Sequence, residues 1–320
     1  MESTSLIQIG ESVHASIPRP HAAMKELLEA GPGVLETASE QLDFIISLIN
    51  DQIKHRADYL EVNVDDFGED DQQVAVDMMR DYTQLVRKHS GNVPICIDSS
   101  NNDVLKTGLE AWYENAPADI SVPMLNSVTT HTVDIILPLR EKYPFKIIAL
   151  LVAEQDSAAG GIEGADKLHE MARRIFDAAT DNYGFQPEDI FFDTTVFPLA
   201  IDMPMMPGTC GYTYRAFETI RLIMNDPDMK GVHTSLGVSN CVKDLPGRKI
   251  GVCRAYLAKA IEYGLDTAIV NVMHDYGLKP VASDLMELVE TFARQDGSSE
   301  TSQKAMELMG LFCQACRKPK

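Results

Sequence analysis

The chain contains eight short apolar segments of the length of a β-strand, each rich in Ile, Val, Leu or Phe. Most of them show no clean alternation of apolar and polar positions, which is typical of strands covered on both faces, as in a parallel sheet. The predicted strands are Ser5–Ile9, Tyr59–Val64, Val93–Asp98, Asp119–Met124, Lys146–Val152, Asp189–Asp193, Gly231–Gly237 and Asp266–Val272.

The stretches between these strands repeat apolar residues every three or four positions, as the buried face of an amphipathic helix does. The stretch 248–264, for example, places Ile250, Cys253, Leu257 and Ile261 on one predicted face. Predicted strands and helical segments alternate eight times, with about 35–40 residues in each βα unit. This alternation indicates an α/β protein whose strands are joined by crossover helices.

Eight parallel βα units in a chain of 320 residues predict a closed (β/α)8 barrel, the TIM barrel. The alternative is an open doubly wound sheet, but the glycine-rich GxGxxG turn of that fold is absent from the sequence. We expect a single domain over residues 1–320, with a strand-to-strand core over about 5–275 and a C-terminal helical tail over 281–320.

Composition and charge narrow the function classes. Hydrophobic residues make up 45% of the chain, enough for a large core, and the formal net charge is −20. Such an acidic chain would be repelled by nucleic acid and by anionic membrane surfaces, so we expect neither as a partner. The sequence has no long apolar run and no signal-peptide pattern at its start, and its six cysteines are scattered. These features predict a cytoplasmic location.

Polar side chains gather where the predicted strands end. The carboxyl ends of the strands form the active face of a TIM barrel, so these side chains are candidate site residues. In chain order they are Glu11, Asn63, Asp65, Asp98, Asn126, Glu154, Asp193, Ser239, Asn240, Asn271 and His274, and His14 could reach them from a loop.

This ring consists of carboxylates and carboxamides with almost no cations, which disfavours a sugar phosphate as ligand. An aminopyrimidinone edge fits better, because a carboxylate can accept hydrogen bonds from a ring N–H and an exocyclic amine together. A magnesium site formed by Asp98, Asn126 and Glu154 is the alternative. No histidine trio has the spacing of metal ligands, so we assign no metal.

Five motifs at the strand ends carry a family resemblance. They are EVNV, CIDSSN, MLNSV, FFDTTVFP and SLGVSN, and they follow the opening IQIGES. In this order and spacing the chain resembles the pterin-binding methyltransferases that act on methyltetrahydrofolate and corrinoid proteins, which are relatives of dihydropteroate synthase. The resemblance covers roughly residues 5–275, and it implies a pterin-binding TIM barrel.

The resemblance also implies site residues. Asp193 matches the aspartate that grips the pyrimidine edge of the pterin, and Asn240 matches the asparagine near N5, the atom that carries the methyl group. Asn240 and Asp98 are the predicted catalytic residues. The full pterin pocket implied by the match contains Glu11, Asn63, Asp98, Asn126, Asp193, Ser239 and Asn240.

In this family the methyl group passes between N5 of tetrahydrofolate and the cobalt of a corrinoid (cobalamin) that a partner protein carries. The resemblance therefore implies tetrahydrofolate or 5-methyltetrahydrofolate as substrate, a corrinoid protein as partner, a homodimer, and a role in anaerobic demethylation and one-carbon metabolism. A tertiary amine is a poor methyl donor until N5 gains positive charge, which the Asn240 carbonyl oxygen can stabilise.

Three other functions stay open. A C–N bond-forming enzyme like dihydropteroate synthase is disfavoured because the predicted mouth has no site for a pyrophosphate leaving group. A magnesium-dependent lyase or isomerase would use the Asp98, Asn126 and Glu154 set. A pterin-binding subunit without activity of its own would bind the substrate and fail to turn it over.

Overall fold

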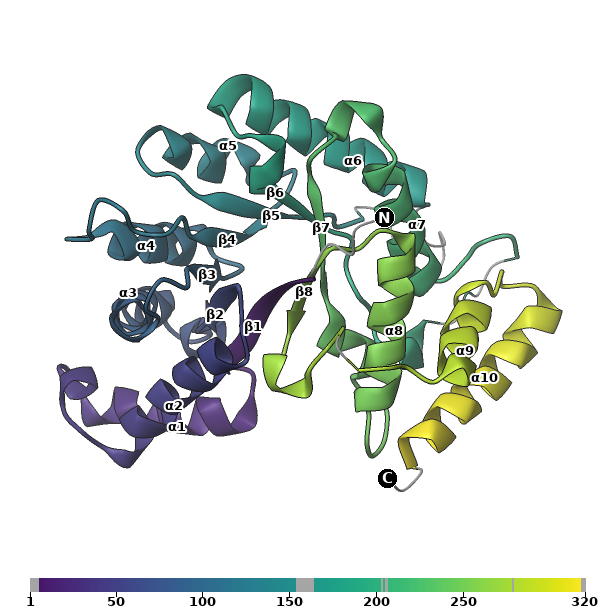
Figure 1. Ribbon diagram of the computed structural model, residues 1–320, viewed down its shortest axis with the longest axis horizontal. Coiled ribbons are helices and arrows are strands. Elements are labelled where there is room, and N and C mark those ends of the chain that lie inside the picture. The colour runs from purple at the N-terminus through teal and green to yellow at the C-terminus, as the bar shows by residue number, and fades with distance from the viewer. Residues whose placement is uncertain (1–5, 154–163, 203, 205–206, 278, 318–320) are drawn as a thin grey trace.

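Eight parallel strands form a closed barrel in the order β1 to β8, which confirms the predicted (β/α)8 architecture (Figure 1). The computed structural model describes the chain except for residues 1–5, 154–163, 203, 205–206, 278 and 318–320. The strands are β1 (Ile7–His14), β2 (Tyr59–Asn63), β3 (Ile95–Asp98), β4 (Met124–Val128), β5 (Lys146–Leu150), β6 (Ile190–Asp193), β7 (His233–Gly237) and β8 (Thr267–Val270).

Helices surround the barrel, as the helical periodicity predicts. They are α1 (Pro18–Ala30), α2 (Glu40–Lys54), α3 (Gln72–His89), α4 (Asn102–Tyr113), α5 (Val133–Ile136), α6 (Ala165–Asp177), α7 (Tyr212–Met224), α8 (Ile250–Tyr263), α9 (Ser283–Ala293) and α10 (Ser299–Arg317). Local chemistry sets several of their starts. The Asn101 side chain, for instance, accepts hydrogen bonds from the Asp103 and Val104 backbone N–H groups, so α4 begins directly after it.

The interior of the barrel contains an apolar layer with a polar layer above it. The apolar layer consists of Ile9, Tyr59, Cys96, Met124, Ile148, Phe191 and Ile269. Alternate residues of a strand face the same side, so the residue two positions later points inward one level closer to the carboxyl ends of the strands. Six of these later residues are polar, namely Glu11, Glu61, Asp98, Asn126, Asp193 and, just after β8, Asn271. The alternation of side chains along the strands therefore places a layer of polar side chains directly above the apolar layer.

The first strand extends further than the sequence predicts. The prediction ends it at Ile9, and its first residue, Ser5, lies outside the described part of the chain, whereas β1 runs to His14. The pairing of β1 with β2 shifts between Gly10 and Val13, which lets the strand continue through a bulge. Glycine is required there because a Cβ at Gly10 would lie 2.3 Å from Gln52 Oε1 of α2.

The fourth strand lies later in the chain than predicted. The segment 119–123 makes other contacts: the Ser121 carbonyl accepts from Trp112 Nε1 at 2.9 Å, and the Ser121 hydroxyl donates to Asn92 O at 2.7 Å. The strand begins at Met124 instead. The sequence suggests a loop at Asn126 and Ser127, but they belong to the strand, in which Asn126 pairs with both neighbouring strands, and their polar side chains line a cavity.

The predicted buried face of α8 is partly wrong. Ile250 and Ile261 are 37% and 39% exposed, and Tyr256 is fully buried instead. The helix contacts α7, α9 and α10, so its buried surface is wider than a single stripe.

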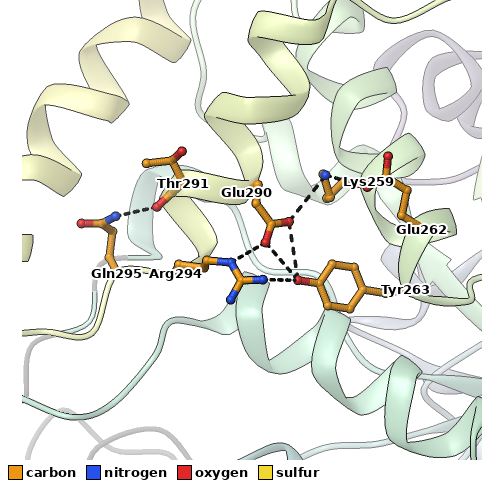
Figure 2. A network of polar contacts seen from close by, with 7 residues as sticks. All are labelled: Lys259, Glu262, Tyr263, Glu290, Thr291, Arg294 and Gln295. Carbon is orange, nitrogen blue, oxygen red and sulfur yellow. Dashed lines mark hydrogen bonds and ion pairs between the residues drawn. The ribbon is translucent and has the colours of Figure 1, made fainter.

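The two last helices lie side by side against α8, at one side of the barrel (Figure 1). A polar network links α8 to α9: Glu290 accepts from Tyr263 and Arg294 and lies 3.6 Å from Lys259 Nζ (Figure 2). Within the described residues, no helix combines the length and apolarity that a membrane span needs.

Candidate functional site

A cavity of about 500 Å³ opens at the carboxyl ends of the strands, the size of a small-molecule site. It is lined by residues from strands or strand-end loops on every side of the barrel. All seven residues of the predicted pterin pocket line it: Glu11, Asn63, Asp98, Asn126, Asp193, Ser239 and Asn240. Among the described lining residues there is no Lys or Arg, so His14 is the only side chain there that can become a cation.

Asp98 is held by its neighbours on the adjacent strands. Strand pairing sets Asp98 opposite Asn63 of β2 and opposite Asn126 of β4. The Asn63 amide donates to Asp98 Oδ2 at 2.9 Å, and His14 Nε2 lies 3.8 Å from the same oxygen, beyond hydrogen-bond distance. Burial raises the pKa of Asp98, and the Asn63 and Glu61 side chains oppose that rise by hydrogen bonding.

Glu61 lies beneath this group and is missing from the prediction. It is 2% exposed, and its Oε2 atom has no hydrogen-bond partner among the described residues. Burial and the nearby Asp98 charge raise the pKa of Glu61 well above its ordinary range. The signal was present in the sequence, because Glu61 lies two positions before Asn63 and therefore shares its inward direction.

On the neighbouring strand β1, Glu11 meets the turn that follows β7. Ser239 in the 3₁₀ turn Val238–Val242 donates its hydroxyl to Glu11 Oε1 at 2.6 Å. Burial raises the pKa of Glu11 to about 7, against the lowering effect of hydrogen bonds from Ser239 and from the Asn271 backbone. Glu11 can therefore gain or lose a proton near neutral pH.

Asp193 ends β6 with its carboxylate in the cavity and only 6% of the residue exposed. The Thr195 backbone N–H donates to its Oδ1 at 2.8 Å, which fixes one oxygen. Burial raises the pKa of Asp193 to about 7, offset in part by backbone hydrogen bonds from Thr195 and Gly237. Each carboxylate oxygen has two lone pairs, so Asp193 can still accept hydrogen bonds from a ligand beside these backbone donors.

Asn240 lies at the exposed rim, where an incoming partner can reach it. Its Nδ2 atom would lie 3.3 Å from a Cβ added to Gly237, so the glycine sets how closely this amide approaches the end of β7.

Asp65 orients the loop after β3. It accepts from the Ser99 hydroxyl at 2.5 Å and from the backbone N–H and hydroxyl of Ser100 at 2.8 Å. Of the remaining strand-end residues, Asn271 caps the next turn by accepting from the Met273 N–H at 3.1 Å. His274 does not line the cavity, and Glu154 lies outside the described residues.

Among the His, Cys, Asp and Glu side chains of the described residues, one group of three is close enough together to hold a cation. Single ligand atoms of His14, Glu61 and Asp98 lie within 4.8 Å of one another. This set differs from the predicted magnesium ligands Asp98, Asn126 and Glu154, of which only Asp98 is shared.

Comparison with known families shows the family to which the chain belongs. The sequence model of the family described as pterin binding enzyme matches residues 35–271, about three quarters of the chain. The chain belongs to the pterin-binding enzyme family. The matched segment contains every residue of the predicted pocket except Glu11, so the resemblance read from the strand-end motifs is confirmed at the level of the family.

Individual relatives are distant. The methionine synthase of Mycobacterium tuberculosis (strain ATCC 25618 / H37Rv) is 25% identical over 282 residues, which cover 86% of this chain and 22% of that protein. The chain thus spans about a fifth of the length of this relative.

Solved structures show a similar barrel. DHPS from Yersinia pestis, determined with a pterine-sulfa conjugate, has a TM-score of 0.50 at 10% identity, covering 90% of this chain and 93% of that one. A dihydropteroate synthase from Coxiella burnetii in complex with pteroic acid has a TM-score of 0.49 at 11% identity, with 97% and 96% covered. The Yersinia likeness supports the fold alone.

Proposed function

We propose that this protein is a methyltransferase that moves a methyl group between N5 of tetrahydrofolate and the cobalt of a corrinoid carried by a partner protein. The observation that carries the proposal is the single cavity lined by all seven predicted pocket residues, with Asn240 at its rim. The family match supports the pterin, and the methionine synthase relative supports the methyl transfer.

The hydrogen-bond donors and acceptors that line the cavity can recognise the pterin. The pyrimidine edge of a pterin offers a ring N–H and an amine side by side. In this proposal both donate to Asp193, whose carboxylate is held by the Thr195 N–H. Asp98, fixed by Asn63, and the carboxamide of Asn126 complete the match by accepting and donating. The apolar layer below, which includes Phe191, limits how deep the ring system enters.

Transfer from 5-methyltetrahydrofolate breaks the bond between N5 and the methyl carbon, and a reduced Co(I) corrinoid supplies the electron pair of the new carbon–cobalt bond. The electron pair of the broken bond stays on N5, so a proton on N5 lowers the barrier. The Asn240 carbonyl oxygen accepts from that N–H and stabilises the charge as it develops. In the reverse direction neutral N5 attacks the methyl group, and the same contacts orient it.

A C–N bond-forming reaction of the dihydropteroate synthase type fits the described residues less well. Such a reaction releases pyrophosphate, and no Lys or Arg lines the cavity within the described ranges to neutralise it. Methyl transfer releases no pyrophosphate, so it needs no such cationic site.

Turnover tests the proposal. EDTA-treated protein is mixed with tetrahydrofolate and methylcobalamin, and 5-methyltetrahydrofolate is measured by mass spectrometry. Product formation supports the methyltransferase. Binding of tetrahydrofolate without product would favour a non-catalytic pterin-binding subunit, and product formation that requires Mg²⁺ would favour a metal-dependent enzyme.

A further inference from the structure

We propose that Glu61 is a positioning residue for the pterin, sharing one proton with Asp98 so that the pair meets the substrate with a single negative charge. This inference rests on the proposed function, because Asp98 is its point of contact with the pterin. It assigns a role to a buried acid that the binding scheme above leaves unused.

The strand geometry brings the two acids together. Glu61 follows Tyr59 by two positions in β2, so it points into the barrel one level above the apolar layer. Asp98 holds the equivalent level in β3, two positions after Cys96. One carboxylate oxygen of Glu61 and one of Asp98 lie within 4.8 Å of each other and of a His14 nitrogen.

The surroundings offer too little positive charge for two ionised acids. Asp65 lines the same cavity, Glu11 and Asp193 add negative charge as they ionise above about pH 7, and burial raises the pKa of the neighbouring Cys96 thiol, which keeps it neutral. His14 Nε2 lies 3.8 Å from Asp98 Oδ2, too far to donate a hydrogen bond. Two adjacent buried carboxylates without a cation hold a proton between them.

The proton belongs on Glu61. The Asn63 amide donates to Asp98 at 2.9 Å, while Glu61 Oε2 has no hydrogen-bond partner among the described residues, and Glu61 is buried whereas Asp98 is partly exposed. Burial therefore penalises a charge on Glu61 more, and it raises the pKa of Glu61 well above the ordinary range. The protonated Glu61 donates to Asp98, whose remaining lone pairs then face the ligand.

The protonated Glu61 therefore helps to hold the Asp98 carboxylate in one position as a hydrogen-bond acceptor for the pterin. With donors from Asn63 and Glu61, the Asp98 carboxylate has one orientation, and its charge is kept without a cation that would compete with the N–H donors of the pterin. If Glu61 ionised, two like charges would face the ligand and Asp98 would lose a donor. The alternative occupant of this place is a divalent cation on His14, Glu61 and Asp98.

Two substitutions of Glu61 separate its role as a hydrogen-bond donor to Asp98 from its ability to ionise. Glu61→Gln keeps a donor for Asp98 and cannot ionise, and Glu61→Leu keeps the bulk and removes the donor. We expect Glu61→Gln to bind 5-methyltetrahydrofolate within about threefold of wild type. Wild type should lose affinity at alkaline pH as Glu61 ionises, and Glu61→Gln should not. We expect Glu61→Leu to bind about tenfold or more weakly, the cost of one hydrogen bond to a charged group. Glu29→Gln, an exposed change on α1, is the matched control.

Infrared spectroscopy can detect the proton shared by Glu61 and Asp98 in the protein without ligand. Infrared difference spectra of wild type minus Glu61→Gln, at about pH 8 where Glu11 and Asp193 are mostly ionised, should show the carbonyl stretch of a protonated carboxylic acid. Absence of that band, equal loss of affinity in both variants, or a stoichiometric divalent metal lost in Glu61→Gln would overturn the inference. Failure of wild type to bind the pterin while the band is present would overturn the proposed function and leave the shared proton standing.

Discussion

Ser239 and Glu11 are 228 residues apart in the sequence, yet the Ser239 hydroxyl donates to Glu11 Oε1 at 2.6 Å. The contact joins the bulged end of β1 to the turn that carries Asn240, across the place where the barrel closes. It links the protonation of a buried acid to the rim residue proposed to act on N5.

Substitution of Ser239 by alanine should therefore change the titration of Glu11. The hydroxyl lowers the pKa of Glu11 from the value that burial alone would impose, so its removal should raise that pKa from about 7 by about one pH unit. Carboxyl-carbon NMR of wild type and Ser239→Ala measures the change. Ser100→Ala is the control, since Ser100 donates to Asp65 instead. An unchanged Glu11 titration would show that the contact is not formed in solution.

Asp193 should make the protein less stable as the pH rises. Its pKa is about 7 in the folded protein against an ordinary value of 3.8, so the folded state binds the proton more tightly. The stabilisation is complete below about pH 4 and is lost as the pH rises through 7. Asp193→Asn should raise the free energy of unfolding at about pH 8 by about 2–4 kcal/mol and change it little near pH 4.

Chemical denaturation of wild type and Asp193→Asn at these two pH values measures that difference. Glu11 titrates in the same window but is common to both proteins and cancels. A less stable Asp193→Asn protein at about pH 8 would contradict the burial of an ionised carboxylate at this position.

Gly237 should control the position of the Asn240 amide. A methyl group at Gly237 would lie 3.3 Å from Asn240 Nδ2, so Gly237→Ala should push this side chain by a few tenths of an ångström. Turnover should fall about tenfold, with pterin affinity and Tm nearly unchanged, because a reacting group is misplaced. Gly251→Ala, whose new methyl group would meet only Leu285 Cδ1 at 3.6 Å, is the control. Equal turnover of wild type and Gly237→Ala would remove Asn240 from the mechanism.

Asn240→Ala should lower kcat far more than affinity. The carbonyl oxygen is proposed to act on the charge that develops at N5, so its loss should cost about 10²-fold in kcat and only a few fold in pterin Kd. Stopped-flow turnover with free cobalamin and a parallel binding titration give the two numbers. A variant that loses affinity and keeps kcat would make Asn240 a binding residue only.

The sequence was informative where one physical rule dominated. Parallel strands with both faces covered are apolar throughout, so most of the strands and the barrel could be predicted from it. The strand period likewise placed Asp98 and Asp193 at the mouth. Glu61 was missed because a charged residue inside a strand reads as solvent-facing, and only a closed barrel makes its direction an interior one.

Other errors arose from tertiary contacts that no local pattern records. Glycine ordinarily marks a strand end, but Gly10 lies within β1. The close approach of Gln52 leaves little room there for a larger side chain. Asn126 and Ser127 can be polar within β4 because their side chains line a polar cavity. The wide buried face of α8 depends on three neighbouring helices, α7, α9 and α10, that the sequence alone does not position.

The most direct test of the central claim, that the cavity is a pterin site, is calorimetric titration of EDTA-treated protein with 5-methyltetrahydrofolate. Wild type should bind in the micromolar range, about −8 kcal/mol, and Asp193→Ala should bind at least about tenfold more weakly, because the pyrimidine edge loses its acceptor. Equal affinity of the two proteins would remove Asp193 from the site. No heat of binding in wild type would mean that the ring of carboxylates and carboxamides serves another ligand.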